Sequence, residues 1–92
     1  MTVTLQEAKN YLRVDYPDDD TLINSMLTAS KELVADIARM HIGEVENSID
    51  ENLKIAILFA TAYLYEHREE ADHHELMLTL RSMLFGVREA AF

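Results

Sequence analysis

The residues best suited to do chemistry lie in one ten-residue stretch, from Glu66 to Glu75, which is rich in carboxylates and imidazoles. Three spacings suggest a metal site, namely Glu66-x-x-Glu69, Glu70-x-x-His73 and Asp72-x-x-Glu75. A di-iron bundle requires two Glu-x-x-His pairs on different helices, whereas this stretch supplies one. Magnesium-dependent all-α nucleotide hydrolases also need acidic motifs that face each other across a bundle. Because these carboxylates crowd into one segment, we expect a solvated helix end and loop, with no metal and no cofactor.

The sequence gives weaker signals for calcium binding and for nucleophilic catalysis. The run Asp18 to Asp20 lacks the alternating ligands, central glycine and terminal glutamate of a calcium-binding EF-hand loop, so we interpret it as the start of a helix. The chain has no cysteine, and none of its serines lies in a nucleophile-elbow context. We therefore predict no catalytic residues and no enzyme activity.

Composition narrows the class of protein further. The 92 residues are expected to form one domain, residues 1–92. The net charge is −9 and no basic block is present, which argues against ordinary phosphate-driven binding to nucleic acid. Two glycines and one proline are few for an all-β fold. The N-terminus has no signal-peptide pattern, and the longest apolar run is too short to cross a membrane.

The elements that must position these residues are organised around one apolar segment. Ser48 and Glu51 have the spacing of a capping box, which predicts a central helix over about 50–68. Nearly every residue from Leu53 to Tyr65 is apolar, so this helix should be covered on more than one side, and another subunit could supply part of the cover. Its predicted core residues are Leu53, Ile57, Leu58, Phe59 and Leu64.

Three further helices are predicted around it, near 5–13, 20–41 and 75–85. Thr4 and Glu7 form another capping box at the start of the first. Gly43 is expected to end the second helix, with residues 42–48 as a loop. Gly86 is expected to end the last helix and to start a short C-terminal tail. The predicted fold class is thus all-α, a small four-helix, bundle-like domain with orthogonal packing.

The C-terminal tail carries apolar residues that a domain of this size has little core to receive. Glycine at position 86 would let the backbone turn away from the last helix. We therefore expect Phe85, Val87 and Phe92 to contact a neighbouring subunit or another protein. The alternative is that the tail folds back on its own domain or is disordered.

Three stretches resemble the small head–tail connector proteins of tailed bacteriophages, also known as DNA-packaging adaptors. They are VTLQEAKNYLRVDYPDDDTLINSML, AILFATAYLYEHREE and LFGVREA, in the order found in that family. The resemblance implies a non-enzymatic virion protein, located in the neck and assembled in the host cytoplasm. It further implies a homo-oligomeric ring, dodecameric in the virion, which docks under the portal, extends the DNA channel and takes part in DNA packaging, DNA retention and tail attachment.

The partners implied by the resemblance are the portal protein, a downstream neck or tail protein, and DNA that passes through the channel without specific binding. An acidic surface suits such a channel, because like charges prevent tight phosphate contacts. Two alternative functions remain from the residues themselves. One is a magnesium-dependent nucleotide hydrolase that uses the Glu66–Glu75 stretch, and the other is a small acidic protein-binding module.

Overall fold

The computed structural model describes residues 3–69 and 73–85, and every regular element in these ranges is a helix. The five helices are α1 (Leu5–Leu12), α2 (Asp20–Ala38), α3 (Ile42–Asn47), α4 (Glu51–Glu66) and α5 (His74–Met83). The predicted all-α class is therefore confirmed. None of the described helices is long and apolar enough to cross a membrane.

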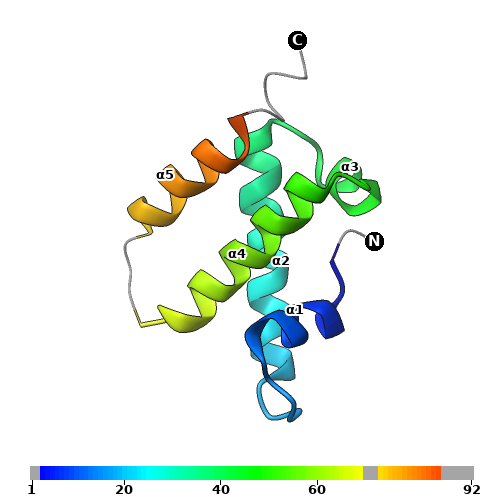
Figure 1. Ribbon diagram of the computed structural model, residues 1–92, viewed down its shortest axis with the longest axis vertical. Helices are drawn as coiled ribbons and strands as arrows, with labels where there is room; N and C mark the ends of the chain where they lie inside the picture. Colours follow the sequence, from blue (N-terminus) through cyan, green and yellow to red (C-terminus); the bar gives the residue numbers. More distant parts are fainter. Residues whose placement is uncertain (1–2, 70–72, 86–92) are drawn as a thin grey trace.

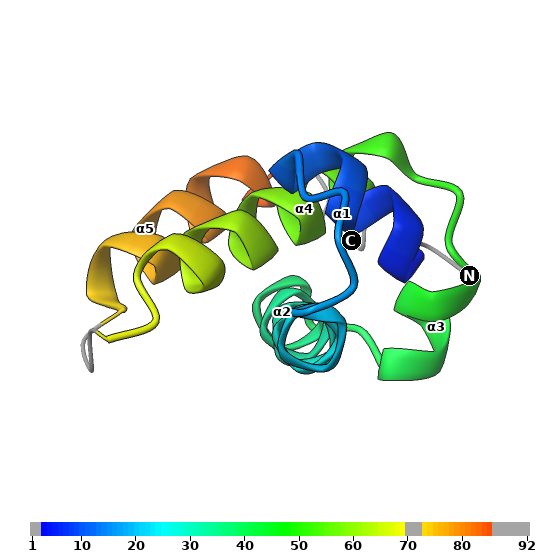
Figure 2. The ribbon, with the colours of Figure 1, turned by 90° about the horizontal axis from the view of Figure 1, so that it is seen from below.

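The helices form two layers. Helix α4 crosses α2, with α1 and α5 on either side of α4 in the same layer (Figures 1 and 2). Helix α3 lies beside α2 in the second layer (Figure 2). Helix α4 thus has a helix beneath it and one on each flank, while its outer face has no helix over it among the described residues.

The crossing of α2 and α4 forms the centre of the core. Ile23, Leu27 and Val34 of α2 are buried, as are Leu53 and Ile57 of α4. Two hydroxyl groups are also buried in this layer. Their burial leaves no hydrogen bond unmade, because each donates to a carbonyl one turn earlier in its own helix. The Oγ of Ser30 donates to the Met26 carbonyl at 2.8 Å, and the Oγ1 of Thr61 donates to the Ile57 carbonyl at 2.8 Å.

The residues predicted to form the core of α4 differ in their burial. Leu53 and Ile57 are fully buried, whereas Leu58, Phe59 and Leu64 are only partly buried against the core. For Phe59, two residues after Ile57, the physical reason is the open outer face of α4. Because α2 covers one side of this helix only, its apolar residues cannot all be buried within a single copy of the chain.

The N-terminal capping prediction for α1 is confirmed. The Thr4 Oγ1 accepts a hydrogen bond from the Glu7 N–H at 3.1 Å, and the Glu7 carboxylate accepts one from the Thr4 N–H at 3.1 Å. The capping box predicted at Ser48 and Glu51 is wrong. Ser48 instead ends α3, and Asp50 is the N-cap of α4, where its Oδ1 accepts from the Asn52 N–H at 2.8 Å.

The second predicted helix is also shorter than expected. Helix α2 ends at Ala38, and residues 42–47 of the predicted loop form the additional helix α3, with Gly43 inside it. The chain turns at Arg39, which has left-handed backbone angles at φ 58° and ψ 46°. Arg13 ends α1 in the same way, at φ 61°. Two arginines therefore occupy the cap position where the sequence rules favour glycine.

Ion pairs between lysines and carboxylates connect the helices. Lys9 of α1 contacts Asp20 of α2 at 2.7 Å, and Lys31 of α2 contacts Glu46 of α3 at 2.8 Å. Lys54 of α4 contacts Glu7 of α1 at 2.5 Å. These are the three lysines of the chain. Since each lysine is neutralised within the fold, the unpaired surface charge comes mainly from carboxylates and arginines.

Candidate assembly surface

Helices α4 and α5 leave large apolar side chains exposed. Ile55 on α4 is 52% exposed, Leu78 on α5 is 46% exposed, and Phe85, which follows the C-cap of α5, is 61% exposed. Leu58 and Phe59 follow Ile55 on α4 and are partly buried against the core. Large apolar side chains that stay exposed on adjacent helices are candidates for an interaction site. We call Ile55, Leu78, Arg81 and Phe85 the α4–α5 face.

The charge of this face differs from that of the whole chain. Between residues 76 and 85 the only charged residue is Arg81, although the chain carries a net charge of −9. Arg81 is exposed and has no ion pair within the described ranges, in contrast to all three lysines. It lies three residues after Leu78, on the same side of α5. Glu75 is also exposed and precedes Leu78 by three residues, so the exposed side of α5 carries one carboxylate and one guanidinium beside its apolar side chains.

The opposite layer presents a polar and acidic surface. Glu32 and Asp36 lie on the side of α2 that faces away from α4, and both are exposed. Between α2 and α3 is a groove of about 290 Å³, lined by Asn24, Thr28, Lys31, Glu32, Ile42 and Glu46. Ile42 is 47% exposed at its edge. We call this feature the α2–α3 groove.

A second hollow separates the end of α1 from the end of α4. Its volume is about 500 Å³, and aromatic residues dominate its lining, with Tyr11 on α1 and Phe59 and Tyr63 on α4. The Tyr63 ring stacks on His67 with centroids 4.2 Å apart, and meets the edge of His73 at 6.1 Å. Because Nδ1 of His67 lies 3.0 Å from the Tyr63 carbonyl, this imidazole is held against its own helix end.

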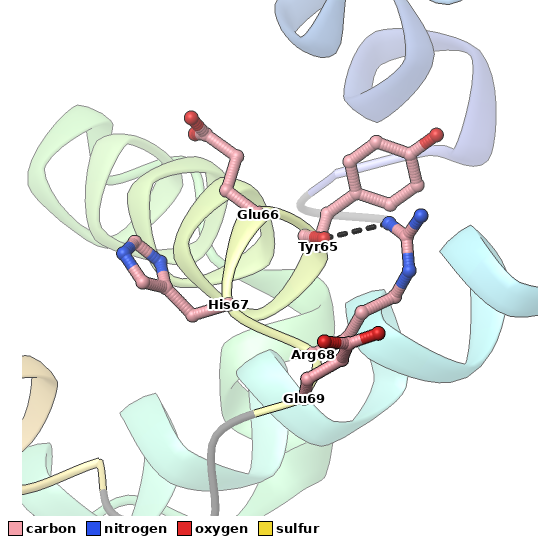
Figure 3. Close-up of a pocket in the computed structure, with 5 residues that line it drawn as sticks. All are labelled: Tyr65, Glu66, His67, Arg68 and Glu69. Carbon is pink, nitrogen blue, oxygen red and sulfur yellow. Dashed lines mark hydrogen bonds between the residues drawn. The ribbon is translucent and has the colours of Figure 1, made fainter.

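The C-terminal end of α4 is joined to the α1–α2 loop by Tyr65. Its hydroxyl donates a 2.6 Å hydrogen bond to Asp19 Oδ2. This bond, followed by partial desolvation and a contact with Tyr16, raises the pKa of Tyr65 to about 12. The cause is electrostatic, since ionising the phenol would place a second negative charge beside the carboxylate. Arg68 lies over the Tyr65 ring at 4.7 Å and donates to the Tyr65 carbonyl at 2.7 Å (Figure 3).

The Glu66–Glu75 stretch does not bring its described carboxylates and imidazoles together. Glu66 and His67 point away from Arg68 and from each other at the end of α4, beside a shallow hollow of about 610 Å³ (Figure 3). Glu69 follows in the turn, and Glu70 and Asp72 lie outside the described residues. Among the residues that are described, no group of three or more potential ligands could hold a metal ion.

Only part of the predicted C-terminal contact can be located. Phe85 is exposed, as an interface residue must be, while Gly86, Val87 and Phe92 lie outside the described residues. Sequence reasoning missed Ile42, Ile55, Leu78 and Arg81. The absence of any carboxylate near Arg81 was a usable signal for the last two, because the rest of the chain is rich in acid.

Taken together, the fold and these surfaces define a small all-helical domain suited to protein–protein assembly. The family model of phage gp6-like head–tail connector proteins matches residues 2–90, so the chain belongs to that family. No curated protein and no solved structure matches the chain. The family is a structural one, located at the virion neck between portal and tail proteins, and it is not a known enzyme family.

Proposed function

We propose that this chain is a subunit of a ring in the phage neck, which docks beneath the portal and extends the channel through which DNA enters and leaves the head. The observation that carries this proposal is the family match over residues 2–90. In this position the ring retains packaged DNA and provides the platform for the next neck or tail protein. The ring number expected in the virion is twelve, as the resemblance implies.

The distribution of charge supports passage of DNA without binding. The chain has 17 acidic and 8 basic residues, and the three lysines are paired with carboxylates inside the fold. A channel wall with this composition repels phosphates, so DNA meets few attachment points as it slides. A protein that gripped the duplex would instead need a cluster of free lysines and arginines.

The C-terminal residues are the proposed contact with the portal or with a neighbouring subunit. Phe85 is exposed at the end of α5, and Val87 and Phe92 continue the apolar pattern along the chain. Burial of exposed aromatic and aliphatic side chains is a common source of binding energy at protein interfaces. In this proposal Phe85, Val87 and Phe92 anchor the subunit in the assembled neck.

The test is a phage that lacks this gene, complemented by the wild-type chain or by a chain that ends after Phe85. Without the gene we expect DNA-packaging particles that lose their DNA or remain without tails, as seen by electron microscopy. The truncated chain should keep the helical circular dichroism signal and fail to restore complete necks. Infectious, tailed particles formed in the absence of the protein would refute the proposed function. Full complementation by the truncated chain would refute the role of the tail alone.

A further inference from the structure

The two layers of the domain carry complementary surfaces on opposite sides. On one side, the α4–α5 face presents Ile55, Leu78 and Phe85 together with Arg81, which has no ion pair within the described ranges. On the other side, α2 and α3 present Glu32, Asp36 and the groove edged by Ile42. Figure 2 shows α4 and α5 in one layer and α2 and α3 in the other. We infer that the α4–α5 face of one copy packs into the α2–α3 groove of the next copy.

A head-to-tail contact is what a ring of more than two copies requires, because a two-fold contact between identical faces closes at a dimer. In the head-to-tail contact Arg81 meets Glu32, which has no basic partner within the described ranges. Complementary charge of this kind sets the register between partners and suppresses wrong pairings.

Apolar area is available on both sides of the proposed contact. Leu78 and Phe85 are about half exposed in the single copy, and Ile42 is exposed at the rim of the groove. The groove is also structurally firm, because its floor includes Lys31, which is buried and joined to Glu46 of α3 at 2.8 Å. A second copy would therefore meet a preformed surface and cover the open side of α4.

This inference rests on the proposed function, since it names the surfaces through which neighbouring subunits of a ring would meet. A contact between two different surfaces repeats from copy to copy and closes into a ring when the rotation allows it. Because these surfaces lie on opposite sides of the domain, each copy can engage one neighbour through each layer.

The chain offers a direct test, because it contains no cysteine. Single variants Leu78→Cys and Thr28→Cys, with tags of different size, are mixed and treated with a short bifunctional maleimide. Thr28 is exposed and lines the groove, and cysteine replaces it with little change of shape. We expect the mixed 78–28 product to exceed both self-linked products severalfold. The matched control replaces Thr28→Cys with Tyr16→Cys, an exposed position in the α1–α2 loop, and should give only background.

A charge-reversal series tests the pairing independently. Arg81→Glu and Glu32→Arg should each reduce the 78–28 product roughly tenfold, and the two changes together should restore it. Circular dichroism of each variant verifies that its helices are intact. Dominant 78–78 product would establish the symmetric contact and overturn the inference. A 78–28 yield at background level, both in solution and in assembled necks that contain the protein, would also overturn the inferred contact. The proposed function would then still stand. Absence of the protein from necks would instead refute the proposed function.

Discussion

The Tyr65 hydroxyl donates a 2.6 Å hydrogen bond to the carboxylate of Asp19, which precedes it by 46 residues in the chain. This bond joins two of the stretches that resemble the connector family, the aspartate run before α2 and the tyrosine-rich end of α4. Asp19 is also the N-cap residue of α2, although its side chain makes no capping hydrogen bond there. The carboxylate is therefore directed to the neighbouring helix, where it fixes the α1–α2 loop against the end of α4.

We expect this hydrogen bond to delay the ionisation of Tyr65 in an alkaline titration. The folded pKa of Tyr65 is about 12, above its ordinary value of 10.0. Because the folded state holds the phenolic proton more tightly, the stabilisation is fully present below pH 10.0 and is lost as the pH rises towards 12. Tyr65→Phe should remove the late step of tyrosinate absorbance, and Asp19→Asn should move it to lower pH. An unchanged titration in Tyr65→Phe would show that another tyrosine carries this step.

The stabilisation that the ion pair between Glu7 and Lys54 provides should be lost at the acidic end of the pH range. The hydrogen bond from Lys54, followed by that from the Thr4 N–H, holds the pKa of Glu7 below its ordinary value of 4.5. Its stabilisation is therefore present above pH 4.5 and lost as the pH falls through the lower folded value. Glu7→Gln should lower the melting temperature at neutral pH and have little effect in strong acid. Lys54→Met should show the same pH dependence, because it removes the main cause.

The stability costs of two substitutions in α4 should distinguish its buried inner face from its open outer face. Ile57 is fully buried between α4 and α2, so Ile57→Ala should cost roughly 2–5 kcal/mol in urea denaturation. Phe59 is only partly buried, and Phe59→Ala should cost clearly less in the isolated chain although it removes more atoms. Equal losses for both variants would mean that the outer face of α4 is covered in solution.

Replacing Arg39 with glycine should change the stability of the fold in an unusual direction. A left-handed conformation costs a non-glycine residue about 1–2 kcal/mol, while glycine adds roughly 0.5–1 kcal/mol of unfolded-state entropy. Since Arg39 has φ 58°, Arg39→Gly should be neutral or stabilising by up to about 1 kcal/mol. Arg39→Ala is the matched control, because it removes the guanidinium and keeps the backbone cost. A large loss for Arg39→Gly, with none for Arg39→Ala, would contradict this account.

The sequence by itself determined the helical class, the start of α1 and the position of the apolar central helix. These features follow from local rules, namely the reciprocal hydrogen bonds of Thr4 and Glu7 and the near-absence of residues that interrupt helices. The resemblance to the connector family was also readable, because it depends on the order of short motifs and the family match confirms it.

Tertiary structure decided where helices end and which apolar residues are left uncovered. Arg39 turns the chain four residues before Gly43, in a left-handed conformation for which local rules favour glycine. Helix α3 then lies beside α2, joined to it by the Lys31–Glu46 ion pair. Likewise Ile57 and Phe59 are both large apolar residues in the sequence, and the position of α2 decides that Ile57 is buried and Phe59 only partly buried. Exposed residues such as Leu78 and Arg81 are identified only once the layers are assembled, because exposure is a property of the packed domain and is not encoded at any single position.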